Sequence, residues 1–139
     1  MHPFRTAVTM IALTLLPAVA GAAEITDAGI TADFQPVVDG AITISEIKAS
    51  ENGFVAVWLP KDNKPFYGRV IGVVTVEAGV HTNIAVPLSE EIGPNQTLGV
   101  VLHRDTGKAG EFEFVLGKEV DLPVMNGRRP VLENIGTLE

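Results

Sequence analysis

The sequence predicts an all-β protein, an antiparallel β-sandwich that is immunoglobulin-like in outline and follows a cleaved N-terminal signal peptide. Two observations predict the sandwich. Short apolar segments rich in Val, Ile, Thr and Phe alternate with Gly, Pro, Asn and Asp turn residues between residues 41 and 124. The same region lacks a sustained helical period, and about six to eight short strands in a chain of this length are typical of a sandwich. A small closed barrel is the alternative architecture.

The first 23 residues have the order of a secretory signal peptide. Arg5 gives a weakly positive start, an apolar run extends from Ala7 to Ala20, and small residues lead to Ala22-Ala23. The run is shorter than the roughly 20 apolar residues that span a bilayer, and Pro17 interrupts it. We therefore expect signal cleavage, one mature domain at residues 24–139, no membrane span after cleavage, and a periplasmic or secreted location.

Six strands are expected in the mature domain. Residues 24–40 add one irregular or edge strand, and Val37-Val38-Asp39-Gly40 turns into the first regular one. The segments that follow are mostly rich in Val, Ile, Thr or Phe, which suit a half-buried pleated surface. The six strands are expected at residues 41–48, 53–59, 68–76, 80–88, 97–104 and 110–116.

Turn chemistry separates these strands. The segment 60–65 contains two prolines, which cannot donate a backbone hydrogen bond to a neighbouring strand. We therefore expect a loop between two strands there. Ala78-Gly79 is expected to be a tight turn, Gly93-Pro94-Asn95 a loop, and residues 105–110 a polar hairpin loop. Asn126-Gly127 is a strong two-residue turn signal, so a last small hairpin is expected around it.

The composition excludes several classes of protein. The chain has ten Lys and Arg residues against seventeen Asp and Glu, and loss of Arg5 with the signal leaves a net charge of −8. A domain this acidic repels phosphate backbones, so nucleic acid is not expected as a partner. The chain has no cysteine, which excludes disulfides and thiolate metal sites.

Three stretches carry a family resemblance. They are residues 53–57 (GFVAV), residues 70–88 around VEAGVHTNIAVPL, and residues 102–107 (LHRDTG) running on to Phe112-Glu113-Phe114 and residues 121–124 (DLPV). Over residues 53–124 the chain resembles a family of uncharacterised exported immunoglobulin-like β-domains of bacteria and halophilic archaea, a domain of unknown function. The resemblance implies an exported β-domain without an established activity. Two features depart from the family pattern: Trp58, where a His is frequent, and Val115-Leu116-Gly117, where Pro-Gly is usual.

No catalytic signature is present in the sequence. There is no G-x-S-x-G elbow, and a Ser-His-Asp triad would need His81 or His103, the two histidines of the mature chain. Nothing marks two of the many carboxylates as a pair. A non-enzymatic protein is therefore expected, and a small hydrolase is one alternative.

The aromatic residues allow two interpretations. Phe54, Phe112 and Phe114 lie on apolar strands and are expected in the core. Trp58, Phe66 and Tyr67 flank the segment 60–65 and are expected to cap the open end of the sandwich. Alternatively, these three side chains form a recognition patch for a partner protein or a carbohydrate.

One group of residues is a candidate metal site. If residues 97–105 and 111–116 form a hairpin in which Asp105 lies opposite Glu111, then His103 lies opposite Glu113. Two like charges directly opposite each other are destabilising unless a metal ion, a protonated His103, or the side chain of Lys108 or Arg104 lies between them. Nitrogen and oxygen ligands of this kind suit zinc or copper. The candidate ligands are His103, Asp105, Glu111 and Glu113.

The sequence thus predicts an exported, non-enzymatic β-domain without a required cofactor, which binds an unknown protein or small ligand or serves as an accessory part of an envelope assembly. The alternatives are a periplasmic divalent-metal-binding protein that uses the His103 face and a small hydrolase.

Overall fold

The computed structural model describes residues 27–139, so the signal peptide predicted for residues 1–23 lies outside the described residues. Residues 27–139 form β-strands and no helix, which confirms the all-β prediction. Within this range, accordingly, no helix is long and apolar enough to cross a membrane. The strands are β1 (Gly29–Thr31), β2 (Ala41–Ala49), β3 (Gly53–Lys61), β4 (Lys64–Val76), β5 (Gly79–Pro87), β6 (Thr97–Arg104), β7 (Met125–Asn126), β8 (Arg129–Pro130) and β9 (Leu132–Gly136).

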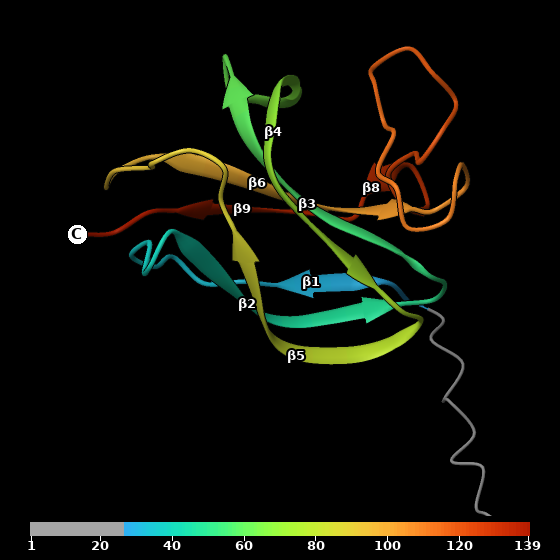
Figure 1. Ribbon diagram of the computed structural model, residues 1–139, viewed down its shortest axis with the longest axis horizontal. Helices are drawn as coiled ribbons and strands as arrows, with labels where there is room; N and C mark the ends of the chain where they lie inside the picture. Colours follow the sequence, from blue (N-terminus) through green and yellow to red (C-terminus); the bar gives the residue numbers. More distant parts are fainter. Residues whose placement is uncertain (1–26) are drawn as a thin grey trace, which may run out of the picture.

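The strands form two packed antiparallel sheets, as predicted for a sandwich. The strand order is β1-β2-β5 in the three-stranded sheet and β4-β3-β6-β9 in the four-stranded sheet. Strands β7 and β8 make a separate small hairpin. Figure 1 shows the three-stranded sheet below the four-stranded one, with the chain crossing between the layers from β2 to β3 and from β4 to β5. The long segment between β6 and β7 (orange) lies on the right of the view. It rises above the four-stranded sheet, on the side away from the three-stranded sheet.

The main core lies between the two sheets. Ile42 and Ile44 of β2 alternate along one face, are almost fully buried, and share the core cluster with Val100 and Leu102 of β6. Each buried aliphatic side chain of this size contributes about 1.5–3 kcal/mol of hydrophobic stabilisation. Ile135 of β9 completes the same layer. The apolar segments predicted as strands at residues 41–48 and 97–104 therefore supply the core.

Strand β3 is buried on both faces. Strand β3 pairs with β4 along one edge and with β6 along the other, and all residues from Gly53 to Trp58 are buried. Val55 and Val57 point into the main core, whereas Ala56 and Trp58 belong to a second cluster on the outer face. A sheet with apolar side chains on its outer face needs a cover, and the segment between β6 and β7 supplies it.

The segment 110–116 is not a strand, so the strand and hairpin predicted there are wrong. The reason lies in the sheet order: β6 pairs with β3 along one edge and with β9 and residues 122–124 along the other, so its ladder has no free edge. Strand β9, which the sequence pattern did not indicate, pairs with Thr97–Val101, and residues 122–124 take the place beside Leu102–Arg104 that was expected for residues 110–116. Phe112 and Phe114 pack instead across the outer face of the sheet.

The β3–β4 hairpin extends further than the sequence suggests. Pro60 and Pro65 lie inside β3 and β4, and the chain turns at Asp62 and Asn63. Both turn residues have positive φ, 52° and 60°, as a tight two-residue hairpin turn requires.

Candidate binding groove on the outer sheet face

A second cluster of apolar side chains covers the outer face of the four-stranded sheet. We call its ring-bearing members the aromatic cluster; they are Phe54, Trp58, Phe66, His103, Phe112 and Phe114. The rings come from β3, β4, β6 and the segment after β6, and most neighbouring pairs meet edge to face. Centroid separations within the cluster run from 4.9 to 6.5 Å. Such pairs contribute about 0.5–1.5 kcal/mol beyond the burial of their area.

His103 lies at the centre of the aromatic cluster and is fully buried. Its ring centroid is 4.9 Å from those of Phe112 and Phe114. The indole N–H of Trp58 donates to Nε2 at 3.4 Å, which leaves the proton on Nδ1 to be donated to the carbonyl oxygen of Asp121 at 2.8 Å. Both ring nitrogens therefore have partners within the protein.

Burial keeps the His103 ring neutral. Loss of solvent lowers its pKa from 6.5 to about 4, although the carbonyl and the charge of Asp121 act in the opposite direction. A neutral ring with two satisfied nitrogens inside a cluster of phenyl rings is a structural element of the sheet face.

Asp121 fastens the segment between β6 and β7 onto the sheet. One carboxylate oxygen accepts the N–H groups of Thr106 and Gly107 at 2.8 and 3.1 Å, and the other accepts the N–H of Glu113 at 2.8 Å. The Asp121 N–H donates in return to the Thr106 hydroxyl at 2.9 Å. Burial alone raises the pKa of Asp121, but these three backbone donors outweigh it and lower the pKa below its usual value. The ionised carboxylate therefore closes residues 106–121 into one loop, and the Asp121 carbonyl links that loop to His103.

The structure does not bring together the four predicted metal ligands, His103, Asp105, Glu111 and Glu113. Among residues 27–139, no group of three or more His, Asp and Glu side chains is placed to hold a metal ion. Asp105 and Glu113 accept backbone N–H groups of their own loop, from Gly110 at 2.9 Å and Lys108 at 2.8 Å, and Glu111 pairs with the Lys108 ammonium at 3.0 Å. The expected hairpin, which would have aligned these side chains, does not form.

Two hollows open side by side over the aromatic cluster. Their volumes are about 410 and 430 Å³, within the range of ligand pockets. Phe66, Phe114 and Leu116 line both hollows, so we treat them as one site, the aromatic groove. The first hollow is also lined by Gly117, Lys118, Glu119, Leu122 and Pro123, and the second by Trp58, Gly68, Arg69, Val70, Phe112 and Val115.

Large apolar side chains stand exposed around this groove. Val115, Leu116 and Leu122 are 54%, 55% and 41% exposed. Val115 and Leu116 directly follow Phe114 in the loop that Asp121 holds in place, and Leu122 directly follows Asp121. An exposed apolar patch beside a hollow marks a place where another molecule can bind.

The three aromatic residues around segment 60–65 have different positions. Trp58 is 5% exposed and is therefore a core residue, as the structural interpretation predicts, but it lies on the outer sheet face and not at an open end of the sandwich. Phe66 is half-buried and lines the groove. Tyr67 is 64% exposed, with the Lys64 ammonium 5.4 Å from its ring centroid.

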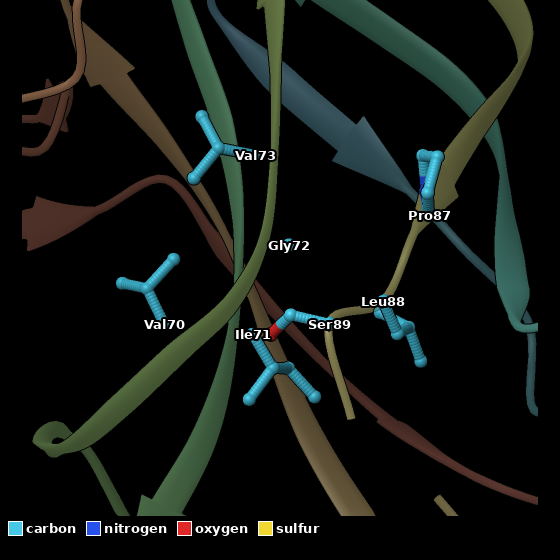
Figure 2. Close-up of a pocket in the computed structure, with 7 residues that line it drawn as sticks. All are labelled: Val70, Ile71, Gly72, Val73, Pro87, Leu88 and Ser89. Atoms are coloured by element: carbon cyan, nitrogen blue, oxygen red, sulfur yellow. The ribbon is translucent and has the colours of Figure 1, made fainter. Parts of the chain in front are cut away.

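A further hollow of about 410 Å³ lies where the two sheets meet at β4 and the end of β5. Figure 2 shows Ile71 and Gly72 on β4 facing the segment of Pro87, Leu88 and Ser89. The Ser89 N–H donates to the Ile71 carbonyl at 2.7 Å, and a Cβ on Gly72 would lie 2.7 Å from the Pro87 carbonyl oxygen. This hollow is a seam between the sheets, and no charged side chain lines it.

Sequence reasoning marked Trp58 and Phe66 but missed the loop residues of the groove. Leu116 and Leu122 have no local pattern that distinguishes them from other apolar residues. The departure from the family pattern at Val115-Leu116-Gly117 is the one signal in the sequence at this place, and it lies beside Trp58, the other departure.

Comparison with known proteins identifies a family but no function. No curated protein and no solved structure matches the chain. Residues 28–136 match the model of a family described as a domain of unknown function (DUF7282). Because this match covers most of the chain and both sheets of the sandwich, the protein belongs to the DUF7282 family.

Proposed function

We propose that this protein is an exported, non-enzymatic binding module whose aromatic groove holds an apolar segment of a partner protein in the periplasm or outside the cell. One observation carries the proposal. Val115, Leu116 and Leu122 stand more than 40% exposed around two hollows that share Phe66 and Phe114. Leaving such side chains in water is unfavourable, and a partner that covers them recovers hydrophobic free energy.

The charges around the groove favour an apolar partner. Arg69 is held by Glu90 through two bonds of 2.6 Å, so its charge is neutralised within the protein. Lys118 and Glu119 line the first hollow together and carry opposite charges. The groove therefore offers no net charge that would select an ionic ligand, although the domain as a whole is acidic.

The shape of the groove favours a protein over a small ligand. Small-molecule sites enclose about 70–90% of their ligand. Here Leu122 lines only the first hollow and Val115 only the second, so a small molecule in one hollow would leave the exposed side chain at the other uncovered. A protein segment that lies across both hollows can cover the projecting side chains as well.

The predicted signal peptide supports the exported location. An apolar run with Ala22-Ala23 at its end directs a chain to the export pathway, and a cysteine-free domain does not depend on the redox state of the compartment it enters.

A hydrophobic dye tests whether the groove binds apolar groups. Binding of an anilinonaphthalene sulfonate dye is measured on the native protein and on Leu116→Asn, with Leu138→Asn as the matched control, because Leu138 is 47% exposed but lies outside the groove. We expect about tenfold weaker dye binding for Leu116→Asn, which corresponds to about 1.4 kcal/mol, and unchanged binding for Leu138→Asn. Dye binding that is equal in all three proteins would contradict a binding site at the groove.

A further inference from the structure

The sequence contains the dipeptide Asn-Gly twice, at Asn52-Gly53 and Asn126-Gly127. In this dipeptide the backbone nitrogen of the glycine can attack the side-chain carbonyl carbon of the asparagine, since glycine has no Cβ to hinder the approach. The reaction needs a peptide nitrogen that is free of hydrogen bonds and a backbone that can move. The fold gives the two dipeptides very different surroundings.

Asn126-Gly127 lies in the turn of the β7–β8 hairpin. Asn126 pairs with Arg129, so Gly127 is the first of two loop residues, and its φ is 63°. Asn126 and Gly127 are both exposed. Within residues 27–139, no hydrogen bond engages the N–H of Gly127. The side-chain amide N–H of Asn126 donates to the carbonyl oxygen of Ala28 at 2.7 Å.

Asn52-Gly53 is held in place from several sides. Gly53 is buried and pairs with both Val76 of β4 and Arg104 of β6, so its backbone belongs to the middle of a sheet. A Cβ on Gly53 would lie 2.1 Å from the His103 carbonyl oxygen, which shows how closely the neighbouring strand approaches. The Asn52 side-chain oxygen accepts the N–H of Ala78 at 3.0 Å. The nitrogen and the carbonyl carbon of this dipeptide cannot move together without opening the sheet.

We infer that Asn126 is a site of spontaneous deamidation in the folded protein and that Asn52 is protected from it. The Gly127 nitrogen forms a bond to the Asn126 side-chain carbonyl carbon, and the side-chain nitrogen leaves as ammonia, which gives a cyclic imide. Water then opens the imide at either carbonyl, so that residue 126 becomes aspartate or isoaspartate. Water is the only co-reactant.

The reaction alters the attachment of the N-terminal strand. The Asn126 amide donates to Ala28, the residue that precedes β1, and a carboxylate at position 126 cannot donate that hydrogen bond. Two acceptors would then face each other at a distance at which they repel. Deamidation therefore weakens the contact between the β7–β8 hairpin and the start of β1.

The two dipeptides can be compared in one sample. Trypsin releases residues 119–128 and 49–61, and each of these peptides contains a single asparagine and no glutamine. After storage of the purified protein in mildly alkaline buffer, we expect peptide 119–128 to gain the mass that exchange of NH₂ for OH gives, with an isoaspartate form among the products, while peptide 49–61 stays unchanged. In protein stored unfolded in denaturant, both peptides should be modified. Equal modification of both in the folded protein, or an unmodified Asn126 under conditions that modify it in the unfolded chain, would overturn the inference.

The structural consequence has a separate readout. Hydrogen exchange of the backbone amides in β1 is compared between the native protein and Asn126→Asp. We expect about fivefold faster exchange in the variant, which is the change that loss of one hydrogen bond of about 1 kcal/mol produces. Exchange in β6 serves as the internal reference and should not change. Unchanged exchange in β1 would show that the Ala28 contact does not hold the strand.

Discussion

Truncation of Trp58 to alanine is expected to lower the free energy of unfolding by about 3–5 kcal/mol, the cost of removing a large buried aromatic side chain. Trp58 is 5% exposed and meets Phe66 and Phe114 edge to face at 5.5 and 5.8 Å. Its indole N–H also donates to Nε2 of His103, so the variant leaves a buried nitrogen without a partner. Urea denaturation of both proteins measures the difference.

The control for this variant is Tyr67→Ala. Tyr67 lies on the next strand but is 64% exposed, so its truncation is expected to change the free energy of unfolding by about 0.5 kcal/mol or less. If the two variants were equally stable, Trp58 would not be part of a packed cluster, and the loop would not cover the outer sheet face.

Acidification is expected to destabilise the fold through His103. In the unfolded chain this histidine takes up a proton at its ordinary pKa of 6.5, whereas in the folded protein its pKa is about 4. Between these two values the unfolded chain binds more protons, so stability falls as the pH is lowered through this window, by about 3 kcal/mol in total. Asp121 adds a further loss only below its ordinary pKa of 3.8, because its folded-state pKa is lowered.

The His103→Gln variant isolates this contribution. Glutamine can donate to the Asp121 carbonyl and accept from Trp58, but it does not titrate. Urea midpoints measured at several pH values should fall between pH 6.5 and 4 for the native protein and fall much less for the variant. The His81→Gln variant, measured in parallel, shows how much of the pH dependence of stability comes from His81. Identical slopes for the native protein and His103→Gln would show that His103 is not buried in its neutral form.

Much of the fold could be predicted because the relevant pattern is local. Short apolar segments rich in Val, Ile or Thr between turn residues placed β2, β5 and β6 close to their observed bounds, and the turn at Ala78-Gly79 forms as expected, with Gly79 at a φ of 132°. In β3 the apolar run GFVAVWL predicts a strand equally well, although the run itself reflects burial on both faces.

The wrong strand predictions concern segments that compete for the same edge of a sheet. Residues 110–116 have a strand-like sequence, yet β9 and residues 122–124 together occupy the edge of β6 that they would need. Strand β9 contains Glu133 and Asn134, and its contribution to the core comes from Ile135. Which of two segments pairs with an edge depends on the whole sheet, so a window of a few residues cannot decide it.

The site could be predicted only in part for a similar reason. His103 was expected on a polar sheet face, because histidine and the acidic residues after it are polar. Its partners come from Trp58, 45 residues away, and Asp121, 18 residues away. These contacts convert a polar residue into the centre of an aromatic cluster, and no local spacing indicates them. The groove depends on the loop that these contacts hold in place.

Site-specific photo-crosslinking tests the central claim, that the aromatic groove binds a partner protein, most directly. A photoreactive phenylalanine derivative replaces Leu116 in the groove or Leu138 outside it, and the protein is irradiated in the cells that produce it. We expect one discrete protein adduct from position 116, its loss when Leu122→Asn is added, and no such adduct from position 138. Adducts that are the same from both positions, or an adduct at 116 that persists with Leu122→Asn, would contradict the account.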